Sequence, residues 1–251
     1  MTAKTILAIA AAATATAALA GCGSTGALDQ LGALKRAARS CPGDARLAAY
    51  VAWDARRTLR TRRIAAARLD SLQRTAEKVA SCGGRLRVVA FGPTAASTAR
   101  LYDGELRPLG ATENARLLRV PRLVDGVLVR VRRALPDVLA EVSGQSADPL
   151  SQFAAAEQFR RQLGGGYALH VVIATSGFGP GVPTGADLAA STAGPDLTGA
   201  DIVIAGLGKV GRGAPTPTRV VDELRRFYTR TCKRTGARSC LAITDLAPLG
   251  G

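Results

Sequence analysis

Few side chains in this sequence have the type and spacing that catalysis requires. His170 is the only histidine, and it lies inside an apolar run, where a structural histidine is expected instead of a general base. The Gly-x-Ser-x-Gly pattern of hydrolases is absent, because Ala174 and Phe178 stand where its two glycines would flank Ser176. The sequence therefore favours a protein that is not an enzyme.

A glycine pattern follows one of the apolar runs. Gly206-Leu-Gly-Lys-Val-Gly211 matches the spacing of dinucleotide-binding loops. In such loops the last glycine opens a helix that holds the pyrophosphate, whereas Gly213, Pro215 and Pro217 prevent a helix here. We expect a tight turn after a strand, and no nicotinamide cofactor.

The N-terminus has the layout of an export signal. Lys4 precedes an uncharged stretch from Thr5 to Ala20 that is short for a transmembrane span. The sequence Leu19-Ala-Gly-Cys22 resembles the lipobox of bacterial lipoproteins, which implies lipid on Cys22 after removal of residues 1–21. We expect a signal peptide over 1–21, a tether over 22–40 and an extracytoplasmic, membrane-anchored protein.

Four more cysteines follow Cys22. An even number in an exported chain favours two disulfides. None of the spacings is of the CxxC or CxxH type that zinc sites use, and three connectivities remain open. The four are Cys41, Cys82, Cys232 and Cys240.

The chain is strongly basic, with a formal net charge of +15 that comes mostly from arginine. A GC-rich genome would produce this composition without functional meaning. Attraction to anionic lipid headgroups or acidic envelope polymers would also favour it. Nucleic acid is not an expected partner, because the chain is exported and has no basic stripe interleaved with aromatic residues.

Apolar runs alternate with helical patterns along the rest of the chain. This alternation predicts an α/β fold with a doubly wound, mostly parallel central sheet and helices on both faces, whose functional edge lies where the strands end. Asp103-Gly104 favours a tight turn between two short edge strands. We expect strands over 47–53, 85–92, 167–174, 201–205 and 241–245, and helices over 58–81, 122–142, 149–163 and 218–233.

The order of these elements over residues 46–246 resembles the von Willebrand factor type A family. In that family, the first strand ends in Asp-x-Ser-x-Ser, which holds a divalent cation, usually Mg²⁺, with a Thr from a middle loop and an Asp after the fourth strand. The resemblance implies one such domain over 41–251. The residues that correspond to its ligands are Asp54, Thr58, Ser146 and Ser176.

Two of these positions depart from the family's pattern. Arg56 replaces the first hydroxyl, and Ser176 replaces the second carboxylate. Since a guanidinium repels Mg²⁺, we expect a degenerate site with no bound cofactor. Two arrangements of Arg56 remain open, and in the first it pairs with Asp54 and fills the cation's place. The alternative is that Arg56 and Arg57 point to solvent at the start of a helix.

The resemblance also implies which cysteines pair. In the family's sheet the first two strands are neighbours, so Cys41 and Cys82, which precede them, would meet at one edge. Cys232 ends the last helix and Cys240 begins the last strand, which implies the second pair.

These observations together favour a non-catalytic binding or scaffold domain, held on a membrane by lipid. It would meet a protein partner through loops at the edge where the strands end; the candidate residues are Asp54, Arg56, Ser146, Asp148 and Ser176. The alternative is an envelope lipoprotein that binds acidic polymers or anionic lipid through its arginine-rich surface.

Overall fold

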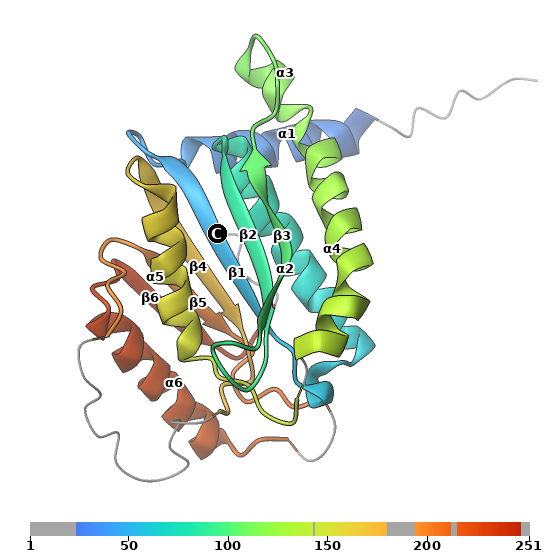
Figure 1. The fold of residues 1–251 in the computed structure, drawn as a ribbon. Helices are drawn as coiled ribbons and strands as arrows, with labels where there is room; N and C mark the ends of the chain where they lie inside the picture. Colours follow the sequence, from blue (N-terminus) through green and yellow to red (C-terminus); the bar gives the residue numbers. More distant parts are fainter. Residues whose placement is uncertain (1–23, 143, 180–193, 212–214, 247–251) are drawn as a thin grey trace, which may run out of the picture.

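A six-stranded sheet forms the centre of the protein (Figure 1). The computed structural model describes residues 24–142, 144–179, 194–211 and 215–246, so the expected signal peptide and Cys22 lie outside it. The strands, in the spatial order β3-β2-β1-β4-β5-β6, are β1 Arg46–Asp54, β2 Gly84–Phe91, β3 Thr98–Leu106, β4 Tyr167–Ala174, β5 Asp201–Ala205 and β6 Ser239–Ile243. All neighbouring pairs are parallel except β2 with β3. This confirms the predicted doubly wound α/β fold.

Helices cover both faces of the sheet (Figure 1). Two large apolar clusters, one on each face, form the core. On one face lie α1 Ser24–Arg39, α2 Arg62–Ser81 and α4 Val120–Val142, and on the other lie α5 Ser151–Leu163 and α6 Thr218–Arg234. Two short elements complete the chain, η1 Arg57–Leu59 and α3 Glu113–Leu117.

Strand β1 lies at the centre because its sequence is apolar on both sides. Every residue from Leu47 to Asp54 is buried, as expected for a parallel strand that is covered on both faces. Consecutive side chains of the strand point to opposite faces of the sheet, so Val51 and Ala52 belong to different core clusters. Asp54, the last residue of β1, is thus carried into a fully buried position by an otherwise apolar strand.

The expected turn at Asp103-Gly104 is wrong, because β3 runs through both residues as one antiparallel edge strand. Asp103 lies opposite Arg87, and its carboxylate forms ion pairs with Arg85 at 2.9 Å and with Arg87 at 2.6 Å. These bonds stabilise the extended conformation, and local turn propensity does not outweigh them. The chain turns instead between Gly92 and Ser97, which are joined by a backbone hydrogen bond of 2.6 Å.

Helix α2 buries much of the face that its apolar spacing indicates, with Leu72, Ala76 and Val79 in the core. Near the start of the helix, Ala65 is exposed, whereas Ile64 and Arg68 are buried. Residues 64, 68 and 72 follow one another by four and lie on one face of the helix. The packing of Ile64 and Leu72 therefore carries Arg68 into the interior.

The expected tether is helical over Ser24–Arg39. Leu34 is buried, and Leu31 and Ala38 pack against the core cluster on the side of α2. A disulfide between Cys41 and Cys82 joins the segment after α1 to the end of α2, and a second joins Cys232 to Cys240. These are the two pairs that the family resemblance implied.

Figure 1 shows α1 lying across the edge at which the parallel strands begin. We call this the amino edge, and the opposite edge, where those strands end, the carboxyl edge. Over the residues that the structure describes, no helix is long and apolar enough to cross a membrane.

Candidate functional site

The carboxyl edge of the sheet brings together three polar residues from two neighbouring strands. Asp54 ends β1, and Thr175 and Ser176 follow β4, which pairs with β1 in parallel so that Trp53 lies opposite Ala174. Gly177 allows the chain to leave the sheet at this point, because its φ of 86° disfavours any residue with a side chain. A β-carbon there would also lie 2.7 Å from the Leu207 side chain.

Arg56 folds back onto Asp54. Its Nε donates to both carboxylate oxygens at 3.0 and 3.1 Å, and its Nη2 donates to Oδ2 at 2.5 Å. The backbone N–H of Arg56 donates to Oδ1 at 3.0 Å. Both side chains are buried, with exposed fractions of 9% for Arg56 and 0% for Asp54. Of the two arrangements that the sequence left open, Arg56 adopts the pairing with Asp54, whereas Arg57 is exposed.

The two residues after β4 complete the cluster. The Thr175 hydroxyl donates to Asp54 Oδ2 at 2.8 Å, and Arg56 Nη2 donates to the Ser176 hydroxyl at 2.5 Å. Both hydroxyls are buried in residues that are at most 2% exposed. Each oxygen of Asp54 thus accepts at least two hydrogen bonds, which uses its lone pairs fully.

A second arginine lies next to this cluster, on the side of the sheet that α2 covers. Arg68 of α2 is buried, and its Nη2 lies 3.4 Å from the carbonyl oxygen of Ala174. Burial lowers the pKa of Arg68 to about 10, an effect that Asp54 opposes and Arg56 reinforces. Its Nε is buried and has no hydrogen-bond partner among the described residues. Asp54, Arg56 and Arg68 together leave one excess positive charge beneath the carboxyl edge.

Tyr228 closes the cluster on the side of α6. Its hydroxyl donates to the carbonyl of Gly177 at 2.9 Å, and burial raises the pKa of Tyr228 well above its ordinary value. The hydrogen bond fixes the turn after β4. The turn in its place keeps Ser176 within reach of Arg56.

Three residues that the sequence suggested for this site lie differently. Asp148 lies in the turn before α5, where its Oδ1 accepts hydrogen bonds from the N–H groups of Leu150 and Ser151 at 3.1 and 3.3 Å. Ser146 is half-buried, and within the described residues its side chain makes no hydrogen bond to Asp54, Arg56 or Ser176. Thr58 lies in η1, and its side chain is outside the description.

The observed arrangement does not fit a divalent cation. Hard oxygen ligands must offer free lone pairs, and those of Asp54 are already taken by Arg56 and Thr175. The Ser176 hydroxyl accepts from the same guanidinium. Arg56 thus occupies the space beside the Asp54 carboxylate, and its charge repels a cation.

The glycine pattern after β5 forms the predicted tight turn. Gly206 and Gly208 have φ values of 92° and 75°, and α6 begins only at Thr218. Beside this turn lies a cavity of about 640 Å³, lined in part by Arg63 of α2 and Lys209. The cavity opens at the same edge of the sheet as the buried cluster.

His170 belongs to the body of the sheet. It lies on β4 opposite Asp201 of β5, and burial lowers its pKa to about 4, with the charge of Lys78 adding to the effect. Its side chain is half-buried, and it lies within β4, as expected of a structural histidine in an apolar run. A larger cavity, of about 990 Å³, lies on the α5 side between Arg87, Gln152 and Arg161, and neither Asp54 nor Arg56 lines it.

Sequence reasoning missed Thr175 and Arg68. Thr175 could have been found, because it is adjacent to Ser176 and points from the same turn. Arg68 could have been found from its spacing, because it lies four positions after Ile64 and four before Leu72, on a helix face that is otherwise apolar. A cation on such a stripe either disrupts the core or reaches a buried acceptor.

Comparisons with known proteins add an overall likeness only. No protein-family model and no curated protein matches the chain. Two crystal structures of the pilus adhesin SpaC from Lactobacillus rhamnosus GG, one in an open conformation, are similar to it at 9% identity, with TM-scores of 0.44 and 0.41. The matches cover 82% and 74% of this chain but only 29% and 27% of the adhesin.

Proposed function

We propose that this chain is an exported, lipid-anchored binding domain without catalytic activity, whose carboxyl edge meets a protein partner independently of metal. The observation that carries the proposal is the buried Arg56–Asp54 pair, in the place where the sequence resemblance implies a metal site. The lipobox at Cys22 and two disulfides, which are typical of proteins outside the cytoplasm, support the location.

In the resembling family the cation keeps one position open for a carboxylate of the partner. Here the guanidinium takes that role. Within the described residues, Nη1 of Arg56 makes no hydrogen bond, while Nε and Nη2 are fully used. The local excess of positive charge from Arg56 and Arg68 favours an acidic group. The partner would therefore present a carboxylate to the carboxyl edge.

Metal independence has a direct test. Mg²⁺ or Mn²⁺ should leave the thermal unfolding midpoint of the wild-type protein unchanged. The double variant Arg56→Ser/Ser176→Asp restores a hydroxyl and a carboxylate around Asp54, so its midpoint should rise with either metal. A micromolar site in the wild-type protein, measured by calorimetry, would contradict the proposal.

Partner binding is tested by affinity capture from solubilised envelopes. Arg57 is exposed beside the cluster and takes no part in the buried pair, so Arg57→Glu should remove captured partners without unfolding the protein. Arg39→Glu, at the amino edge, is the matched control and should retain them. Unchanged capture by the Arg57→Glu protein would count against the carboxyl edge as the binding surface.

A further inference from the structure

The most exposed large apolar side chains among the described residues lie together at the amino edge. Leu109 is 75% exposed and Leu118 is 64% exposed. Both belong to residues 107–119, which connect β3 to α4 and include α3; we call this segment the α3 hairpin. Figure 1 shows α3 projecting beyond the sheet at the end where α1 lies.

The hairpin has a defined structure. Arg119 Nη1 donates to the carbonyl of Leu109 at 2.8 Å, which ties its two arms together. The Thr112 hydroxyl accepts from the N–H of Ala115 and caps α3, and Leu117 is buried beneath it. The two exposed leucines are therefore held outward by a folded segment, and they lack any core contact that would explain them.

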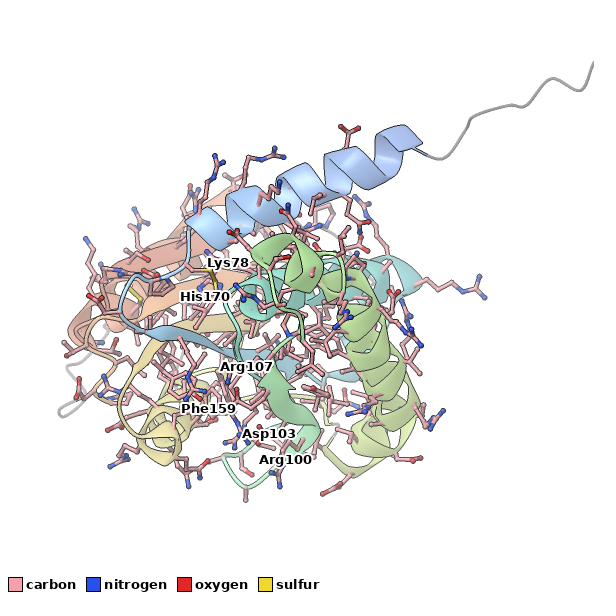
Figure 2. All side chains as sticks on the ribbon, turned by 90° about the horizontal axis from the view of Figure 1, so that it is seen from above. Lys78, Arg100, Asp103, Arg107, Phe159 and His170 are labelled. Atoms are coloured by element: carbon pink, nitrogen blue, oxygen red, sulfur yellow. A yellow bond between two sulfur atoms is a disulfide. The ribbon has the colours of Figure 1, made fainter. Side chains whose placement is uncertain are left out.

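The surroundings of these leucines are basic. Arg107 and Arg116 are exposed on the hairpin, and Arg36 and Arg39 are exposed on the adjacent α1. Within the described part of the chain none of these four forms an ion pair, and the only acidic residues on the two segments are Asp29 and Glu113. Figure 2 views the molecule from this side. In this view α1 crosses the surface, and Arg107, the first residue of the α3 hairpin, is labelled.

Apolar side chains surrounded by unpaired arginines match the interface of an anionic bilayer. The leucines would enter the boundary of the acyl chains while the guanidinium groups meet phosphate. The position of the lipid anchor points to the same surface. Cys22 precedes the first residue of α1, Ser24, by only two residues, and the Cys41–Cys82 disulfide holds the other end of α1 at the amino edge.

We infer that the amino edge lies on an anionic membrane surface, with Leu109 and Leu118 of the α3 hairpin inserted at the lipid interface. The carboxyl edge then faces away from the membrane, toward a partner. This orientation rests on the proposed lipid anchor for its proximity to the membrane. The exposed leucines and unpaired arginines carry the choice of surface.

Depth-dependent fluorescence quenching tests the orientation. The full-length protein is expressed in bacteria, purified from membranes and reconstituted into vesicles of equal parts phosphatidylcholine and phosphatidylglycerol, with bromine on the acyl chains. The single native tryptophan, Trp53, is 4% exposed at the carboxyl edge and gives a constant background. The probes are Leu118→Trp, at the amino edge, and Val210→Trp, a matched control that is 38% exposed at the carboxyl edge.

Bromolipid should quench the Leu118→Trp protein roughly twofold more than the Val210→Trp protein. Adding Arg107→Glu and Arg116→Glu to the Leu118→Trp protein, or replacing the anionic lipid by phosphatidylcholine, should reduce that difference. Equal quenching of the two probes, or stronger quenching of Val210→Trp, would overturn the orientation. A difference that is insensitive to charge would overturn the preference for anionic lipid.

The outcomes separate this inference from the proposed function. Protein that floats with the vesicles and carries a fatty-acid label lost in Cys22→Ala, but shows no quenching of Leu118→Trp, retains the anchor and refutes the docking surface. Quenching of Leu118→Trp without a lipid label at Cys22 supports the surface and refutes the anchor. Crosslinking of residue 118 to a protein in cells, without quenching in vesicles, refutes the membrane as occupant.

Discussion

The charged residues around Asp54 at the carboxyl edge differ in burial and in pairing from the arginines near the α3 hairpin at the amino edge. At the carboxyl edge, Asp54 and Arg56 are buried and bonded to each other, and the hydroxyls of Thr175 and Ser176 complete the cluster. At the amino edge, Arg36, Arg39, Arg107 and Arg116 are exposed beside exposed leucines and form no ion pair within the described part of the chain. A buried ion pair is bonded in a single geometry, whereas an exposed basic and apolar surface suits a fluid partner such as lipid.

This difference also separates stability from binding. The charges of the carboxyl edge are part of the interior, so changing one should cost folding free energy as well as recognition. The exposed groups of the amino edge make few contacts within the protein, so changing them should cost binding alone.

Loss of the Arg56 side chain should have the largest effect on stability. Arg56→Ala leaves the carboxylate of Asp54 buried without its cation, which should lower the free energy of unfolding by about 4 kcal/mol. Urea denaturation measures the change. Arg57→Ala, at the exposed neighbouring residue, should change it by less than about 0.5 kcal/mol. Equal losses in the two variants would show that the buried ion pair contributes no more to the free energy of unfolding than the exposed Arg57 does.

The disulfide at the amino edge should come next. It closes a loop between cysteines 41 positions apart, and the Cys41→Ser/Cys82→Ser variant should lose about 3 to 4 kcal/mol. Cys232→Ser/Cys240→Ser opens a loop with a separation of only 8 and should lose about 1 kcal/mol less. Chemical denaturation under non-reducing conditions compares them. A larger loss from the shorter loop would indicate that loop entropy does not dominate here.

His170 should make the protein sensitive to acid. Its pKa in the folded protein is about 4, below the ordinary value of 6.5, so the unfolded chain binds the proton first as the pH falls. The stabilisation is complete above about pH 6.5 and is lost between about pH 6.5 and pH 4, by about 3 kcal/mol. Unfolding free energies measured across this range should fall in the wild-type protein and fall less in His170→Gln. Parallel curves would exclude His170 as the cause.

The exposed leucines should have the smallest effect on stability. Leu109→Ser/Leu118→Ser should shift the free energy of unfolding by less than about 0.5 kcal/mol, because neither side chain is buried. The same variant should bind anionic vesicles less well in flotation assays. A large loss of stability would mean that the leucines pack within the protein and are not available to lipid.

Much of the fold followed from sequence patterns. The near-continuous apolar run at Tyr167–Ala174 predicted a buried parallel strand at its observed bounds, and Asp201–Ala205 likewise. Local signals failed where long-range contacts outweighed them. Asp103-Gly104 has strong turn propensity, yet the ion pairs of Asp103 with Arg85 and Arg87 across the strands hold it extended.

The candidate site divides in the same manner. The residue order was enough to predict that Asp54 ends a buried strand two positions before Arg56, because the apolar run from Leu47 to Trp53 stops at this charge. The approach of Thr175 and Arg68, which lie 121 and 14 positions from Asp54, is a product of tertiary packing. Such contacts depend on strand order and on the rotation of α2, which arise when the whole core packs and which no local pattern encodes.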